Sequence, residues 1–193
     1  MGLFENVNGC SKVVLLSLIT ISGCNQISIS KLATPVIDSF DTDSQGWYVS
    51  KEAVGGYSRT GGYPGGYIYG NDNSPRTWYF VAPERFIHEV QHGYGKTLRF
   101  DLEQSATDAQ FDAADIILTD SITTITFDTA YNPDTTWTGY SIAIDERAGW
   151  EKGLLKATKE DIQLVLQNLR GFRIRGEYRS GPDRGGLDNV SIR

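Results

Sequence analysis

The chain has 193 residues, 24 of them acidic and 18 basic, and a formal net charge of −6 at pH 7. An acidic chain is repelled by the phosphate backbone, so the composition argues against general nucleic-acid binding. With the N-terminal segment set aside, about 158 residues remain, which is the length of a single domain with a sizeable core.

The N-terminus has the pattern of a bacterial lipoprotein signal peptide. Lys12 precedes the apolar run Val13–Ile21, which suits a signal peptide and is too short to span a bilayer. The run ends in Ile21-Ser22-Gly23-Cys24, which resembles the lipobox, whose cysteine receives a diacylglyceryl group. We expect residues 1–23 to be removed and Cys24 to become the lipidated N-terminus. The alternative is an ordinary secretory signal with an incidental cysteine.

This signal places the protein in the cell envelope, anchored to a membrane by lipid. Cleavage removes Cys10, so the remaining chain has no thiol for a metal site or nucleophile, and no disulfide. Residues 24–36 are polar and predict a tether to a domain of residues 37–193. Asn25 follows the lipidated cysteine, which favours the outer membrane if the host is Gram-negative.

Short strands separated by turn residues predict an all-β sandwich or barrel. Apolar and polar residues alternate clearly in Leu98–Leu102 and Tyr140–Ile144. The predicted strands are Trp47–Ser50, Tyr67–Tyr69, Trp78–Val81, Leu98–Glu103, Asp115–Thr119, Ser121–Asp128, Tyr140–Glu146, Phe172–Arg179 and Leu187–Arg193.

One short helix is predicted near residues 159–169, packed on the sandwich. Thr158 can cap it, Asp161 stands three residues on, and Gly171 ends the segment. Apolar residues follow at helical spacing: Ile162, Val165, Leu166 and Leu169.

Aromatic residues in turn-rich segments are candidates for ligand binding. The segment Tyr57–Gly70 is rich in Gly and Tyr, and predicts a binding loop or a loop that covers one edge of the sandwich. Its Tyr63 and Tyr67, with Trp137 and Trp150 farther along the chain, offer flat faces for a sugar or a protein. The alternative is that these rings pack in the core.

The two histidines form His88-Glu89-Val90-Gln91-His92, which fits the HExxH zinc protease motif. A catalytic zinc needs three protein ligands, and the extended motif has its third histidine where this chain has Leu98. Phe86, Ile87 and Val90 also predict that the histidines face solvent. We therefore expect no enzyme. A zinc hydrolase and a glycosidase with paired carboxylates remain as alternatives.

The arginines of Phe172–Arg179 alternate with apolar residues. This pattern predicts a solvated strand face or, alternatively, a site for a polyanionic sugar.

Several segments form a pattern when taken in order: Trp78–Pro83, Phe86, Tyr94-Gly95, Leu98–Asp101, Asp115–Leu118, Thr158–Leu169, Phe172–Tyr178 and Gly185–Val190. In this order they resemble the laminin B (laminin domain IV type A) family over Phe40–Ile192. The resemblance implies a jelly-roll β-sandwich related to galactose-binding-like and carbohydrate-binding modules, an extracellular or envelope setting, and no catalytic residues. Laminin partners are not carried over, because the module stands alone without EGF-like cysteine repeats.

A structural calcium is predicted where the chain ends meet. In a jelly roll the first and last strands can lie side by side, which would bring Asp38, Asp41 or Asp43 near Asp188. Clustered carboxylates with loop carbonyls suit Ca²⁺. The alternative is that these residues cap turns and strand ends.

Together these features predict a membrane-anchored, non-catalytic binding module for a glycan or an extracellular protein. Besides the two enzyme alternatives, the protein could be a purely structural envelope lipoprotein.

Overall fold

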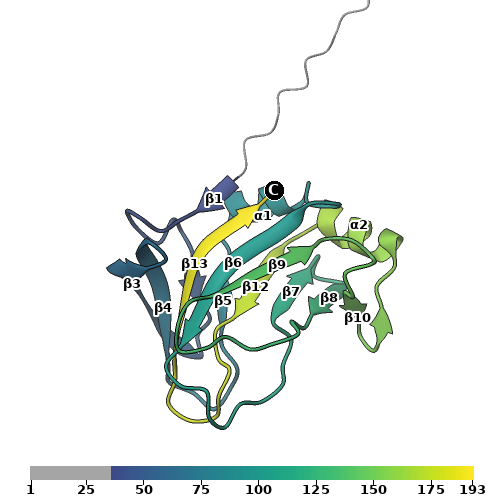
Figure 1. Ribbon diagram of the computed structural model, residues 1–193. Coiled ribbons are helices and arrows are strands. Elements are labelled where there is room, and N and C mark those ends of the chain that lie inside the picture. The colour runs from purple at the N-terminus through teal and green to yellow at the C-terminus, as the bar shows by residue number, and fades with distance from the viewer. Residues whose placement is uncertain (1–35) are drawn as a thin grey trace, which may run out of the picture. The chain divides into compact units, whose positions relative to one another are not determined.

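The computed structural model describes residues 36–193, which form a sandwich of two antiparallel β-sheets with two short helices (Figure 1). The all-β jelly-roll sandwich predicted from the sequence is confirmed. No helix of the described residues is long and apolar enough to cross a membrane.

The six-stranded sheet has the order β3-β4-β13-β6-β9, and β1 also pairs with β13. Its strands are β1 (Val36–Asp38), β3 (Ala53–Gly62), β4 (Gly65–Asp72), β6 (Thr97–Gln104), β9 (Thr138–Ala143) and β13 (Arg184–Ile192). The seven-stranded sheet has the order β11-β10-β8-β7-β12-β5-β2. Its strands are β2 (Tyr48–Val49), β5 (Tyr79–Val81), β7 (Ile116–Thr119), β8 (Thr124–Phe127), β10 (Glu151–Lys152), β11 (Leu155–Lys156) and β12 (Gly171–Arg175).

The first and last strands lie side by side, as expected. β1 pairs antiparallel with the end of β13, so that Val36 is opposite Ile192 and Asp38 is opposite Val190. Figure 1 shows β1 beside the C-terminal end of β13. A β-bulge between Asp188 and Ser191 interrupts the pairing of β13 with β6.

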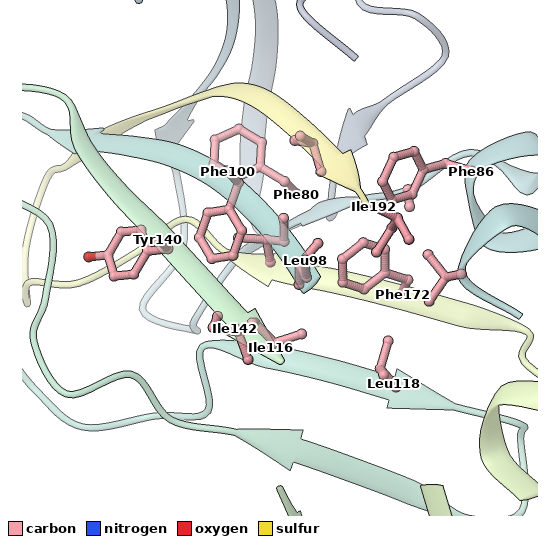
Figure 2. Packing of buried hydrophobic residues seen from close by; sticks show 14 of the residues in the cluster. Phe80, Phe86, Leu98, Phe100, Ile116, Leu118, Tyr140, Ile142, Phe172 and Ile192 are labelled. Carbon is pink, nitrogen blue, oxygen red and sulfur yellow. The ribbon is translucent and has the colours of Figure 1, made fainter. Parts of the chain in front are cut away.

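Alternating side chains build the core between the sheets. In β6, Leu98, Phe100 and Leu102 are buried, whereas Arg99 between them is exposed. Full burial of one such apolar side chain contributes about 1.5–3 kcal/mol. The residues labelled in Figure 2 come from both sheets and from helix α1: Phe80, Phe86, Leu98, Phe100, Ile116, Leu118, Tyr140, Ile142, Phe172 and Ile192.

Helix α2 (Lys159–Gln167) forms where the sequence predicts it. The Thr158 hydroxyl accepts from the Asp161 backbone N–H at 3.1 Å, and the Asp161 carboxylate accepts from the Thr158 N–H at 3.1 Å. This capping box satisfies two backbone groups that the helix leaves unpaired. Its apolar face is buried on the sandwich and includes Ile162, Val165 and Leu166.

A second helix, α1 (Glu84–Val90), corrects the expectation of a single helix. Pro83 stands at its N-cap, and Phe86 and Val90 are its buried residues. Seven residues are too few to show a clear helical period in the sequence.

The Gly- and Tyr-rich segment Tyr57–Gly70 is also not a loop. It forms most of the β3–β4 hairpin at one edge of the six-stranded sheet. Glycines at paired positions, such as Gly56 opposite Tyr69, weaken the sequence signal for a strand. Pairing between the two strands of the hairpin, rather than local propensity, therefore decides the structure of this segment.

Candidate functional site

The outer face of the six-stranded sheet is polar and aromatic. Side chains alternate between the two faces of a strand, so residues opposite each other on paired strands face the same way. Tyr69, Gly186 and Glu103 form one such row across β4, β13 and β6. Asp188 and Asp101 belong to the next row of this face.

Two of the predicted ligand-binding aromatics meet on this outer face. The rings of Tyr67 and Trp137 contact edge to face with centroids 5.4 Å apart. The Arg184 guanidinium lies 3.8 Å from the centre of the Tyr69 ring and donates to the Tyr67 hydroxyl at 2.9 Å. Tyr67 is only 9% exposed, so its ring supports the cluster and has little surface for a ligand.

The tip of the β3–β4 hairpin folds over the outer face. The Trp137 indole N–H donates to the Gly61 carbonyl at 2.9 Å. The Tyr63 backbone N–H donates to the Asp188 carboxylate at 2.5 Å, and the Asn189 side-chain amide donates to the Tyr63 carbonyl. These three bonds hold the tip in place, while the Tyr63 side chain itself stays 61% exposed.

Two carboxyl groups at the hairpin tip are shielded from solvent, Asp188 wholly and Asp101 in part. Burial raises the pKa of Asp188 to about 6, and the negative charges of Asp101 and Asp41 add to the effect. Burial also raises the pKa of Asp101, against the lowering effect of a hydrogen bond from the Asn189 amide at 2.9 Å.

Beside the hairpin tip, the outer face is hollowed by a cavity of about 470 Å³. We name this cavity the Tyr63 groove. Its lining includes the side chains of Tyr63, Arg99, Asp101, Ser141, Ser191 and Arg193. Its floor is one row across four strands, in which Ile37 is opposite Ser191, Ser191 opposite Arg99, and Arg99 opposite Ser141.

Other cavities have similar volumes. One of about 420 Å³ lies at the open edge of the sandwich, where Tyr48 of β2 faces the glycines of β3. Another, of about 570 Å³, lies beside Glu177 and Asp72. The Tyr63 groove differs from both by combining an exposed aromatic ring with guanidinium, carboxylate and hydroxyl groups, which is the mixture that orients a polar ligand.

The prediction that Trp150 binds a ligand is wrong. Its side chain is fully buried, its indole N–H donates to the Ala143 carbonyl at 2.8 Å, and its ring lies 5.2 Å from that of Phe127. It packs in the core because the chain turns back against the seven-stranded sheet after β9. The ligand-binding roles of Trp137 and Tyr63 stay predictions.

The four predicted calcium ligands are brought together only in part, which corrects the predicted site. Asp41 lies near enough to Asp188 for its charge to raise the Asp188 pKa, but Asp38 and Asp43 have other partners. Both Asp38 oxygens accept from the Arg85 guanidinium, at 2.9 and 3.0 Å, and one also accepts from the Trp47 indole at 2.7 Å. Asp43 accepts from the Gln45 N–H, as a turn cap does. Among residues 36–193, no three acidic, histidine or cysteine side chains are placed to hold a metal ion.

The HExxH residues lie on α1 and the turn that follows it. His88 and His92 are exposed, with ring centres 5.6 Å apart. Leu98, at the position of the third histidine, is buried in the core. The described part of the chain supplies no third ligand, so these residues do not build a catalytic zinc centre there. Cys24 lies outside the described residues.

Residues 79–193 match the model of the Laminin B (Domain IV) family, and the chain belongs to this family. It is 26% identical to laminin subunit gamma-1 of Danio rerio over 97% of this chain and 12% of that protein. It is 30% identical to human laminin subunit gamma-1 over 59% of this chain and 7% of that protein. The chain thus spans 12% or less of the length of these relatives.

Solved structures share the sandwich. The L4b domain of human laminin alpha-2 superposes with a TM-score of 0.61 at 14% identity, over 82% of this chain and 96% of that chain. A family 11 carbohydrate-binding module of the Clostridium thermocellum cellulase Lic26A-Cel5E has a TM-score of 0.51 at 13% identity, over 82% and 94%. At these identities the likeness establishes the fold alone. The resemblance to laminin B expected from the sequence is confirmed.

Proposed function

We propose that the protein is a non-catalytic binding module, anchored in the cell envelope by lipid, that binds a glycan in the Tyr63 groove. The groove itself carries the proposal. Its volume of about 470 Å³ is within the usual size of small-ligand sites, roughly 300–1,000 Å³. The exposed Tyr63 ring can stack on the apolar face of a sugar, and the polar floor can pair with sugar hydroxyls.

The family and the shared fold support a module of this kind. One solved structure with the same sandwich is described as a carbohydrate-binding module, which makes a sugar a reasonable ligand for this fold. The choice of groove rests on the residues of this chain, because function depends on the site and not on the fold. An extracellular protein bound on the same face is the competing ligand.

The first prediction concerns the Tyr63 ring. Tyr63→Ala should weaken glycan binding by up to about tenfold, since a stacked aromatic ring contributes roughly 0.5–1.5 kcal/mol. Binding can be measured on a glycan array and by calorimetry with the strongest ligand, and melting curves should show that the variant remains folded.

The matched variant is Tyr48→Ala. Tyr48 is 59% exposed but lies on β2, in the other sheet, where it lines the cavity at the sandwich edge. This variant should bind as the parent does. Loss of binding in Tyr48→Ala with normal binding in Tyr63→Ala would move the site to one of the two cavities that Tyr48 lines, at the sandwich edge or beside α1. Absence of glycan binding, with capture of an extracellular protein that Tyr63→Ala abolishes, would replace the glycan by a protein partner.

The second prediction concerns the anchor. Cys24→Ala should release the protein from membranes and abolish labelling by a radioactive or clickable fatty acid, because the thioether needs the cysteine sulfur. Stable attachment needs more than one acyl chain, which lipoprotein processing supplies. Cys10→Ala, which changes the other cysteine, should have no effect. Unchanged membrane fractionation of Cys24→Ala would show that Cys24 is not the anchor.

A further inference from the structure

We propose that the glycan bound in the Tyr63 groove carries a carboxylate, and that Arg99 and Arg193 hold this carboxylate. The inference rests on the proposed glycan-binding function. It assigns the ligand to the class of acidic sugars, such as uronic and sialic acids.

The two arginines lie next to each other on the outer face. Thr97 and Arg193 pair through two backbone hydrogen bonds, of 2.8 and 3.1 Å. Arg99 is two residues beyond Thr97 on the same strand, so it projects from the same face as Arg193. Diagonal neighbours on adjacent strands have Cβ atoms about 7–8 Å apart or less, within the reach of two long side chains that share one carboxylate.

Neither of these guanidinium groups is neutralised by the described part of the chain. Among residues 36–193, the ion pairs of arginine are those of Arg85, Arg147, Arg175 and Arg179. Arg99 and Arg193 are exposed and form no ion pair there. In a chain of net charge −6, two adjacent unpaired arginines favour an anionic ligand.

Ser191 gives an independent reason to place a ligand in the groove. It lines the cavity between Ile37 and Arg99, and it is 1% exposed. Its hydroxyl oxygen is buried and has no hydrogen-bond partner among the described residues. A buried polar group without a partner is unfavourable. The hydroxyl is shielded from solvent in the unbound protein, so a ligand oxygen would satisfy it once the side chains that cover it move aside.

The opposite end of the groove suits hydroxyl groups. One oxygen of the Asp101 carboxylate accepts from the Asn189 amide. The other faces Gly139, where a Cβ atom would approach it to 3.0 Å, so the missing side chain keeps this oxygen open. A carboxylate accepts hydrogen bonds from sugar hydroxyls and repels a second carboxylate. The groove therefore orients an acidic sugar with its carboxylate toward Arg99 and its hydroxyls toward Asp101.

The test uses the purified full chain and a panel of acidic polysaccharides: polygalacturonate, alginate, hyaluronan and polysialic acid. Each is paired with its carboxyl-reduced form, which has the same backbone without the charge. At least one acidic polymer should bind about tenfold more tightly than its reduced form, and added NaCl should weaken that binding. Dextran sulfate and dextran form a further pair, because a sulfate could use the same arginines.

Three variants locate the binding. Arg99→Gln should weaken binding of the acidic polymer about tenfold, whereas Arg59→Gln, an exposed arginine of β3, should leave it unchanged. Ser191→Ala should raise the melting temperature, since an unpaired buried hydroxyl is removed, and should also weaken binding. A Ser191→Ala variant that melts higher and binds normally would remove the serine from the site and overturn the inference.

The outcomes separate this inference from the proposed function. Equal binding of acidic and reduced polymers, lost in Tyr63→Ala but kept in Arg99→Gln, would overturn the carboxylate and leave glycan binding standing. Binding of dextran sulfate alone, lost in Arg99→Gln, would replace the carboxylate by a sulfate. Absence of binding to every polysaccharide would overturn both proposals.

Discussion

Arg175→Met is expected to lower the free energy of unfolding by about 3–5 kcal/mol, because it leaves a buried carboxylate without its partner. Arg175 is 1% exposed, and its guanidinium forms an ion pair with Asp115, which is also 1% exposed, at 3.4 Å. The guanidinium also donates to the carbonyls of Phe111 at 2.6 Å and Ala113 at 3.0 Å. One side chain thus binds the 111–115 segment to the end of β12.

Urea unfolding at pH 7 measures the effect, and Arg173→Met is the matched control. Arg173 is two residues earlier on the same strand but exposed, so its replacement should change stability by less than about 0.5 kcal/mol. The double variant Arg175→Met, Asp115→Asn should recover part of the loss, because the orphaned charge is removed. A loss in Arg175→Met no larger than that in Arg173→Met would contradict the role of this ion pair.

The two arginines also show how far strand alternation predicts the structure. By alternation Arg173 and Arg175 lie on one face of the strand, and the sequence predicts that face to be solvated. Arg173 is exposed, as predicted, but Arg175 is buried because Phe111 and Tyr178 stack on its guanidinium, 4.6 and 4.4 Å from their ring centres. Phe111 lies more than 60 residues away in the chain. No local pattern contains that information.

Elements with a strong local period were predictable. The helix after Thr158 has a capping box and apolar residues at helical spacing, and β6 alternates without exception from Leu98 to Leu102. Elements without a clear local period were missed, whether their partner strand is distant, as for β1, or the next one in sequence, as for β3 and β11. β1 and β11 have three and two residues, too few for any period, and the long strand β3 is interrupted by glycines.

The Tyr63 groove was predictable only in part. Alternation around Leu98 correctly directs Arg99 outward. The same rule fails for the end of β13, because a bulge separates Asp188 from Ser191 and Asn189 adopts a positive φ of 53°. Strict alternation from Asp188 would direct the Ser191 side chain into the core. The bulge reverses this and places the Ser191 hydroxyl on the outer face.

Charged residues near each other in sequence were also a poor guide to a metal site. The expectation that the first and last strands meet was correct, yet Asp38 is paired with Arg85, which is 47 residues away. The sequence shows how many carboxylates gather near a chain end. It does not show which cation from another element will neutralise each of them.

Raising the pH from about 5 to about 8 is expected to reduce stability, and Glu177 should account for about 2 kcal/mol of the loss. Glu177 is 4% exposed, and its carboxylate accepts from the Trp78 backbone N–H at 3.2 Å. Burial raises the pKa of Glu177 from 4.5 to about 7, and the charges of Asp72 and Asp183 add to it, against the opposing effects of the Trp78 hydrogen bond and of Arg175.

The direction follows from proton binding in the two states. Between about pH 4.5 and 7 the unfolded chain has released the Glu177 proton, whereas the folded protein still holds it. Stability therefore falls as the pH rises through this window, and the loss is complete above about pH 7. Asp188 contributes with the same sign up to its raised pKa of about 6. Asp161 has the opposite sign, but its pKa is lowered to about 2, so its contribution changes only at lower pH.

Glu177→Gln tests this assignment, because glutamine still accepts from the Trp78 N–H and does not titrate. The variant should match the parent near pH 4.5 and be more stable by about 2 kcal/mol at pH 8, as measured by urea unfolding at several pH values. Glu52→Gln is the control. The Ser50 hydrogen bond lowers the pKa of Glu52, so this control should keep the decline of the parent between pH 5 and 8. If Glu177→Gln loses as much stability as the parent over that range, the decline belongs to another group, and Asp188, which holds the hairpin tip beside the Tyr63 groove, is the next to test.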